Sequence, residues 1–207
     1  FPMPNQLNFL LRYSVQNNDN ELQKHVENTL IKMANGGIYD QVGGGFSRYT
    51  VDEEWHIPHF EKMLYDNAQL VSLYSHAYQL TGNAYFKKII DETLDFVNSE
   101  LTQKEGAFYS SINADSKTNS GVLKEGAFYI WTKKELETVI GADMELFSFY
   151  YNINEARKWE DDRYILYKTK SDVAFLKEFG LTQQQLDVLV RDWKSKLDTY
   201  RKDRERP

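Results

Sequence analysis

The side chains best suited to acid–base chemistry lie in or near one glycine-rich segment, residues 36–67. Histidine and carboxylate groups can carry protons, and aromatic side chains can stack on a sugar ring. This segment combines five glycines with such groups, a combination that a simple connecting loop does not require. We therefore predict that it forms the wall of a site. His59 and Asp66 are candidate catalytic residues within it, and Asp115, further along the chain, is a third.

Apolar residues recur at helical spacing over residues 59–80 and form one face of a predicted helix. Three polar residues lie within this face or at its edge. Asn67 falls near the middle of the apolar arc, and His59 and Asp66 fall at its edge. A buried polar group without a partner costs roughly 1–3 kcal/mol, so these side chains need partners from another segment or a water-filled cavity. We expect a cleft beside the first half of this helix.

Each of these three residues also has a purely structural explanation. Asn67 can hydrogen-bond to a neighbouring backbone, and Asp66 can form an ion pair with Arg48. His59 can simply stand near the start of the helix. The sequence does not choose between these explanations and a role in a site.

The other polar and aromatic candidates are equally open. Trp55 and Tyr49 are either core aromatics or a stacking platform, and Asp115 is either an acid–base group or an Asx-turn residue. The spacing of His56 and His59 could suit a metal ion. A proline lies between them and no third ligand is evident, so we expect no metal site.

The elements that must position these residues are mainly helical. Apolar residues recur at helical spacing in four segments of the first half, which predicts two antiparallel helix pairs. Pro58 suits the first turn of the third helix, and Asn83 suits the cap of the fourth. We expect these helices over residues 6–16, 20–34, 58–80 and 84–101.

The second half mixes short strands with helices. The sequence Glu-Gly-Ala-Phe-Tyr occurs at residues 105–109 and again at 125–129, which predicts two strands of a small β-hairpin near residues 107–130. A capping box at Thr132 and Glu135 predicts a helix to residue 140. The other expected elements are a helix over residues 143–151, a strand over 163–168, a short helix after Ser171 and a long helix after Thr182.

Composition restricts the classes of function. The chain has 207 residues, no cysteine and a formal net charge of −6, which excludes disulfides and thiol catalysis and argues against nucleic acid as a partner. No apolar run approaches the ~20 residues that span a bilayer, so we expect no membrane partner and a cytoplasmic location. No P-loop or dinucleotide fingerprint is present, and we expect no cofactor. We expect one domain over residues 1–207, cut from a longer protein, with a solvated charge run at residues 201–207.

Four motifs of this chain occur in the same order in one protein family. They are GGIYDQVGGGFSRY at residues 36–49, WHIPHFEKMLYDN at 55–67, FYSSINADS at 108–116 and EGAFYIWT at 125–132. Through them the chain resembles the YyaL-type, spermatogenesis-associated family of thioredoxin-domain proteins. The resemblance covers most of the chain, is strong through residue 132 and weakens afterwards.

This resemblance implies a mainly all-α fold and a set of site residues. Family members carry a thioredoxin-like domain followed by an (α/α)6 toroid of the six-hairpin glycosidase type, similar to N-acylglucosamine and cellobiose epimerases. This chain would be the N-terminal part of that toroid, and the thioredoxin-like domain and the later hairpins would be its partners in the parent protein. The implied substrate-binding residues are Tyr39, Arg48, Tyr49, Trp55, Glu61, Tyr65 and Asn67.

The chain departs from the family pattern at several positions. The family usually has histidine where Gln41 stands and often where Ser47 stands. Ile112 and Asn113 replace an acidic pair. Because an apolar side chain cannot transfer a proton, these changes imply that part of any acid–base chemistry is lost.

Two functions remain open from the sequence. The first is a carbohydrate-binding or sugar epimerase- or isomerase-like enzyme domain, in which His59, Asp66 or Asp115 carries protons for a small carbohydrate. The second is a non-catalytic module that holds a ligand or a protein partner for an attached thioredoxin-like domain. In either case, a partial toroid exposes apolar surface, so we expect the piece to self-associate.

Overall fold

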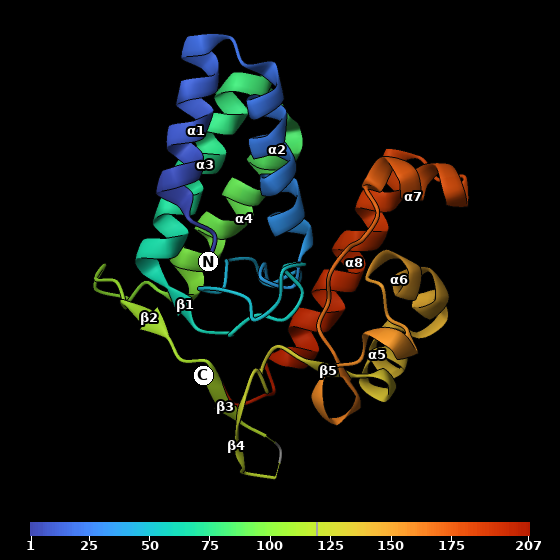
Figure 1. The fold of residues 1–207 in the computed structure, drawn as a ribbon. Coiled ribbons are helices and arrows are strands. Elements are labelled where there is room, and N and C mark those ends of the chain that lie inside the picture. The colour runs from blue at the N-terminus through green and yellow to red at the C-terminus, as the bar shows by residue number, and fades with distance from the viewer. Residues whose placement is uncertain (119) are drawn as a thin grey trace.

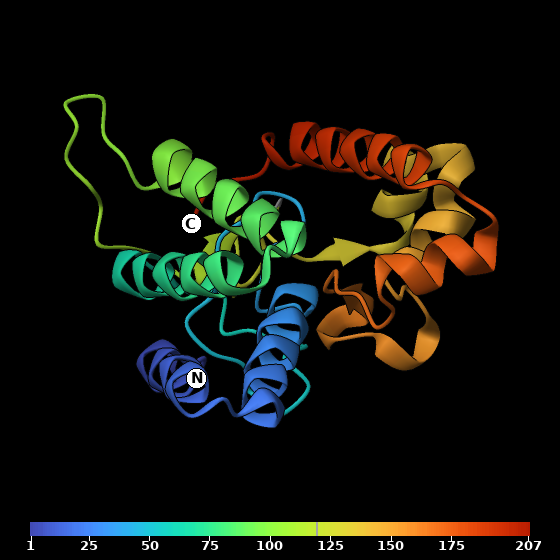
Figure 2. The ribbon, with the colours of Figure 1, turned by 90° about the horizontal axis from the view of Figure 1, so that it is seen from above.

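The computed structural model describes residues 1–118 and 120–207 and is mainly helical (Figures 1 and 2). Consecutive helices of the first half run in opposite directions, so that α1 and α2 form one antiparallel pair and α3 and α4 another (Figure 1). Helix α1 also packs against α3. The two predicted helix pairs are therefore confirmed, with bounds of α1 (Pro4–Asn17), α2 (Asn20–Asn35), α3 (Leu64–Thr81) and α4 (Ala84–Glu100).

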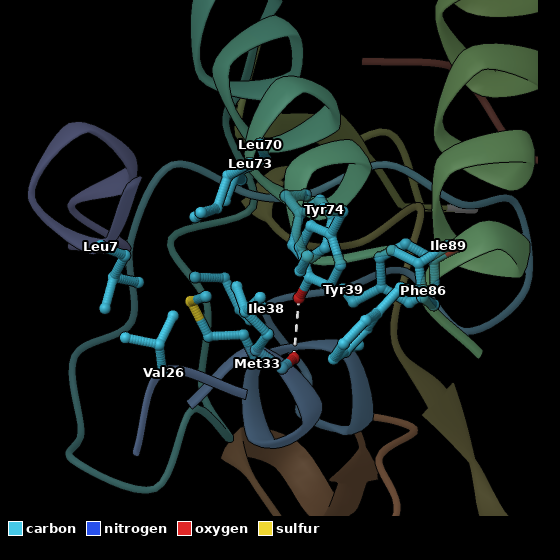
Figure 3. Packing of buried hydrophobic residues seen from close by; sticks show 14 of the residues in the cluster. Leu7, Val26, Met33, Ile38, Tyr39, Leu70, Leu73, Tyr74, Phe86 and Ile89 are labelled. Atoms are coloured by element: carbon cyan, nitrogen blue, oxygen red, sulfur yellow. Dashed lines mark hydrogen bonds between the residues drawn. The ribbon is translucent and has the colours of Figure 1, made fainter. Parts of the chain in front are cut away.

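These four helices enclose the first hydrophobic core (Figure 3). Leu30 and Met33 of α2 have no exposed surface, and neither have Leu70 and Tyr74 of α3. Full burial of such a side chain is worth roughly 1.5–3 kcal/mol, so this core holds the two pairs together. The Tyr74 hydroxyl donates a hydrogen bond to the Leu30 carbonyl oxygen at 2.7 Å, which satisfies the polar group inside the core.

The second half packs three short α-helices and one long α-helix around a second core, beside one end of the first bundle (Figures 1 and 2). At its centre, the rings of Phe147 and Trp193 meet edge to face with centroids 5.5 Å apart. The α-helices here are α5 (Lys133–Ile140), α6 (Met144–Tyr150), α7 (Asp172–Phe179) and α8 (Gln183–Arg201). Single-turn 3-10 helices are η1 (Gly141–Asp143), η2 (Glu155–Arg157) and η3 (Glu160–Asp162).

Side-chain caps fix where several of these helices begin. Asn83, Thr132, Ser171 and Thr182 each accept a hydrogen bond from an amide in the first turn of the following helix. At α5 the Glu135 side chain also accepts a hydrogen bond from the Thr132 amide, which completes the predicted capping box. These predicted helix starts are confirmed.

Short antiparallel ladders link the helical parts. The ladder between β1 and β2 ties the start of α3 to the segment that follows α4. The ladder between β5 and β6 ties the start of α5 to the segment before α7. The pairs are β1 (Lys62–Met63) with β2 (Ser111–Ile112), β3 (Asp115–Lys117) with β4 (Leu123–Glu125), and β5 (Trp131–Thr132) with β6 (Arg163–Tyr164).

The hairpin expected near residues 107–130 is present, but its strands are not the repeated motifs. Asp115 faces Glu125 in the β3–β4 ladder, whereas Phe108 in the first motif bridges to Thr102. In the second motif, Gly126 has a φ of +70°, which ends the strand and turns the chain inward. The predicted strand over 163–168 is also shorter, because only its first two residues form a ladder.

The predicted start of the third helix was wrong. Helix α3 begins at Leu64, because Pro58 forms a bridge with Thr50 and Phe60 has a φ of +34°, which a right-handed α-helix does not accommodate. His59 therefore lies in irregular backbone outside the helix. The prediction for Asn67 was correct, since this polar side chain on α3 has no exposed surface.

Candidate functional site

The glycine-rich loop that follows α2 lies tightly against α4. Gly44 and Gly45 have φ values of +74° and +78°, a region that favours glycine. A Cβ atom at Gly44 would lie 2.5 Å from the Glu92 carbonyl oxygen, and one at Gly45 would overlap the Phe96 ring. The loop therefore needs these glycines in order to reach its place beside the helix.

Asn67 holds the end of this loop. Its Oδ1 atom accepts a hydrogen bond from the Phe46 amide at 2.7 Å. Its Nδ2 atom donates to the carbonyl oxygens of Phe46 and Met63, at 3.0 and 2.9 Å. These contacts support the structural explanation of Asn67, because the buried amide is satisfied by neighbouring backbone.

A buried ion cluster joins the loop to α8. Asp40 accepts hydrogen bonds from Arg201 Nη1 at both carboxylate oxygens, at 3.0 and 2.8 Å. Lys62 Nζ donates to Asp40 Oδ2 at 3.2 Å and to the Gly44 carbonyl oxygen at 2.8 Å. Lys62 and Arg201 are only 1% and 4% exposed, so both cations are held away from bulk water.

The members of this cluster shift one another's pKa. Burial alone would raise the pKa of the Asp40 carboxyl, but Arg201, Lys62 and two loop amides together hold it well below its usual value. Burial, assisted by the positive charge of Arg201, lowers the pKa of Lys62 to about 8 against the opposing effect of Asp40. The carboxylate therefore stays ionised at neutral pH, while the lysine amine can lose its proton close to it.

A cleft of about 750 Å³ opens beside the ion cluster, between α4, α8 and the loop at residues 40–43. This volume lies in the range of small-molecule sites. Part of its wall is aromatic, from Phe96, Tyr109, Phe128 and Tyr129. Hydrogen-bonding groups surround these rings, from Asp95, Asn98, Ser99, Glu100, Thr102, Ser195 and Asp198.

Several residues that the sequence singled out have structural partners elsewhere. Tyr39 is buried, and its hydroxyl donates a hydrogen bond to Glu92 Oε2 at 2.6 Å. Burial, together with the Glu92 charge, raises the pKa of this hydroxyl well above its usual value. Arg48 forms an ion pair with Glu61 at 3.2 Å, and both side chains are partly exposed.

His59, Asp115 and Tyr49 gather at the hairpin. His59 Nδ1 lies 2.8 Å from Glu125 Oε1, and Glu125 stands opposite Asp115 in the β3–β4 ladder. The Tyr49 ring stacks on the His59 imidazole, with centroids 4.8 Å apart. The Asp115 amide donates to Asn113 Oδ1 at 3.2 Å, an Asx-turn contact. The structure thus brings two of the three candidate catalytic residues into one neighbourhood.

The third candidate, Asp66, has an unusual carboxylate. Its Oδ2 atom is buried and has no hydrogen-bond partner among residues 1–118 and 120–207. Burial raises the pKa of Asp66, while the charge of Arg48 acts in the opposite direction. The ion pair considered between these two residues is not formed, because Arg48 contacts Glu61 instead. Of the remaining candidates, Trp55 packs half-buried against the first core and Tyr65 is exposed.

None of the site residues named from the sequence lines the 750 Å³ cleft in the described part of the chain. His56 and His59 also have separate surroundings, since the His56 ring packs on Tyr167 and His59 contacts Glu125. Within residues 1–118 and 120–207, no three histidine or acidic side chains gather in a way that could hold a metal ion. In the same residues, no helix has the length and apolar character needed to cross a bilayer.

Sequence reasoning missed the ion cluster. A helix beginning at residue 58 places Lys62 on its polar face, and Arg201 belongs to the charge run expected to be solvated. That expectation was also wrong for Arg204, which donates to the carbonyl oxygens of Phe128 and Ile130 at 2.9 and 2.7 Å. The one available signal was Asp40, since an acid inside a tight glycine-rich loop requires a cationic or amide partner.

Comparison with known proteins identifies relatives of this chain. The chain is 46% identical to spermatogenesis-associated protein 20 of Rattus norvegicus over 145 residues. It is 44% identical to the Mus musculus protein over 158 residues and 43% identical to the Homo sapiens protein over 171 residues. The alignments cover 68%, 72% and 75% of this chain, but 18%, 20% and 22% of the relatives. The chain therefore spans about a fifth of the length of these relatives. No family model matches it.

Proposed function

Since this chain is homologous to a segment of spermatogenesis-associated protein 20, we propose that it forms the first part of a helical toroid whose cleft binds a small carbohydrate. The arrangement of α1–α4 supports the architectural part of this proposal. An (α/α)6 toroid is built from successive helical hairpins, and these helices form two such hairpins in sequence order. The later hairpins and a thioredoxin-like domain belong to the longer protein.

The choice of a carbohydrate as the ligand is supported by the lining of the 750 Å³ cleft. Sugars present apolar C–H faces and many hydroxyl groups, so they bind where aromatic rings and hydrogen-bonding side chains alternate. Tyr129 and Phe96 supply rings next to the ion cluster, and Asn98, Ser99 and Asp95 supply donors and acceptors along the last turns of α4. The volume accommodates a mono- or disaccharide.

The chemistry that suits this cleft is epimerisation or isomerisation through an open-chain sugar. Such a reaction needs a group that is partly neutral near pH 7, so that it can take up a proton or attack the carbonyl carbon. Lys62 has this property, and its ionised neighbour Asp40 holds it in place. The proton carriers that the sequence named, His59, Asp66 and Asp115, are not part of the cleft lining.

Ligand-observed NMR of the full-length protein tests the proposal. The panel is glucose, mannose, N-acetylglucosamine and cellobiose, and the readouts are saturation transfer to the sugar and the appearance of epimer signals. Ser99→Trp should abolish saturation transfer, because Ser99 is an exposed residue in the cleft wall. Ser72→Trp, at an exposed position on α3 outside the cleft lining, is the matched control and should bind as the parent does.

The alternative function is a binding module without turnover, serving the attached thioredoxin-like domain. It is favoured by the hydrogen bonds of Asn67, which tie up that polar group, and by Ile112, which lines the cleft where the family pattern has an acid. Saturation transfer without any epimer signal would select this alternative. Absence of both signals across the whole panel would refute the carbohydrate proposal.

A further inference from the structure

Lys62 is a buried amine at the floor of the cleft. The residue is 1% exposed and contributes to the lining between Asp40 and Tyr129. Its Nζ atom lies 4.4 and 4.8 Å from the ring centroids of Phe96 and Tyr129, so aromatic carbon replaces water on two sides. A lysine desolvated in this way is a candidate nucleophile, since the neutral amine is the reactive form.

Burial and the surrounding charges together lower the pKa of the Lys62 amine. Its hydrogen-bonded carboxylate, Asp40, is shared with Arg201, which takes contacts to both carboxylate oxygens. The other titratable groups that face it are Tyr129 from the segment after the hairpin and Glu100 from the end of α4. Burial and Arg201 outweigh the two acids and lower the pKa of Lys62 to about 8. Near pH 7.4 a pKa of 8 leaves roughly one amine in five neutral, against about one in a thousand for an ordinary lysine.

A second lysine in the cleft lining does not share this arrangement. Lys194 Nζ contacts Glu92 Oε1 at 2.7 Å. Burial lowers the pKa of Lys194 as well, but its side chain is 19% exposed, against 1% for Lys62. Lys202 is exposed and contacts Asp198 at 2.8 Å. Near-complete burial against two aromatic rings distinguishes Lys62 from both.

We propose that Lys62 Nζ forms a reversible imine with the aldehyde group of an open-chain sugar, or of another small hydroxyaldehyde, bound in the cleft. This inference rests on the proposed function and assigns its reacting group. The neutral amine adds to the carbonyl carbon, forming a C–N bond, and the carbonyl oxygen takes up a proton. The carbinolamine then loses that oxygen as water and leaves a C=N bond, so no oxidant or reductant is required. An imine acidifies the neighbouring C–H bond, which is the bond that epimerisation breaks.

Reductive trapping of the full-length protein tests this inference. The protein is incubated with glycolaldehyde and sodium cyanoborohydride, and adducts are located by peptide mass spectrometry. We expect Lys62 to be labelled at least about tenfold faster at pH 7.4 than Lys87, an exposed lysine on α4, because of the difference in neutral amine. The labelling rate of Lys62 should rise through pH 8 and then level off. Labelling of Lys62 no faster than that of Lys87 would overturn the inference.

Two variants test whether the labelling depends on Lys62, and one further class of ligand separates sugar binding from imine formation. Lys177→Arg, at an exposed position on α7 outside the cleft lining, should leave the Lys62 adduct intact, while Lys62→Met should remove it without creating another fast-labelled site. If Lys62→Met does not fold, the adduct map of the parent protein still decides the question. Methyl glycosides cannot open to an aldehyde, so saturation transfer to them tests the carbohydrate cleft alone. Binding of methyl glycosides without any Lys62 adduct would refute the imine and leave the proposed function standing.

Discussion

Arg201 and Asp40 stand 161 positions apart in the chain, and the guanidinium Nη1 atom donates to both carboxylate oxygens, at 3.0 and 2.8 Å. The absence of a side chain at Gly43 leaves room for this contact, since a Cβ atom there would overlap Arg201 Nη2. The glycine-rich loop, the end of α8 and the floor of the cleft are therefore one connected piece of structure.

Replacing Arg201 by methionine should destabilise the protein by about 3–5 kcal/mol, because it leaves the buried Asp40 carboxylate with only one cationic partner. Urea unfolding followed by circular dichroism measures the change. Arg191→Met is the matched control, since Arg191 is an exposed residue of the same helix, and it should change stability by less than about 0.5 kcal/mol. Equal effects of the two substitutions would show that the ion cluster contributes nothing to stability.

Gly45→Ala should destabilise by roughly 2–5 kcal/mol, the sum of a left-handed backbone strain and an overlap with the Phe96 ring. Gly82→Ala is the control. It has a comparable φ of +67°, but a Cβ atom there meets nothing within 4 Å, so only the strain of about 1–2 kcal/mol applies. Comparing the melting temperatures of the two variants separates the cost of the overlap with the Phe96 ring from the cost of the backbone strain. A Gly45→Ala loss no larger than that of Gly82→Ala would contradict close packing of the loop on α4.

Asn67→Asp should cost about 2–4 kcal/mol at pH 7. The substitution keeps the acceptor for the Phe46 amide but removes both donated hydrogen bonds and adds a charge where no surface is exposed. Asn20→Asp, at an exposed position at the start of α2, should stay within about 0.5 kcal/mol of the parent. Chemical denaturation at pH 7 gives both values. A small loss for Asn67→Asp would mean that Asn67 does not hold the loop.

Asp66→Asn should stabilise the protein slightly at pH 7, by less than about 1 kcal/mol because the carboxylate is partly exposed and screened. The folded-state pKa of Asp66 is raised above its unfolded value. The parent therefore loses stability as the pH rises from about 4 through the folded pKa, whereas the amide variant does not. Melting temperatures from pH 3 to pH 8 should show a difference that grows with pH. A constant difference would contradict the raised pKa.

His59→Gln should leave sugar saturation transfer unchanged in the full-length protein, because His59 contacts Glu125 at the hairpin and does not line the cleft. The stability change should also be small, about 1 kcal/mol or less, because both side chains of this contact are partly exposed. Ser99→Trp provides the positive control for lost binding. Loss of binding in His59→Gln would move the ligand site from the cleft to the hairpin.

Much of the helical framework could be predicted from the sequence, and its local origin explains why. Asn83, Thr132, Ser171 and Thr182 each cap the helix that follows, and a cap depends only on the residues next to it. The burial of Asn67 also followed from periodicity within one helix. Pro58 misled the prediction, because a proline that suits a helix start suits an extended bridge equally well.

The cleft could not be predicted, because its parts meet only through distant contacts. Lys62 and Arg201 are unremarkable in their own segments. Asp40 signals the need for a partner but not which one, because the pairing depends on where α8 ends relative to the glycine-rich loop. The repeated Glu-Gly-Ala-Phe-Tyr motif gave a wrong strand prediction for the opposite reason. Its two copies look alike, yet Phe108 is exposed while Phe128 packs beneath Arg201, since tertiary context decides which copy is buried.

The span from Asp40 to Arg201 also has a consequence for synthesis on the ribosome. Helices α1 to α4 and the glycine-rich loop leave the ribosome well before α8, and at about 5–20 residues per second the separation of 161 residues corresponds to roughly ten to thirty seconds. During that interval Asp40 and Lys62 have each other but not Arg201. The floor of the cleft is therefore completed late, and a nascent chain that stops short of α8 carries the glycine-rich loop without the partner that holds its carboxylate.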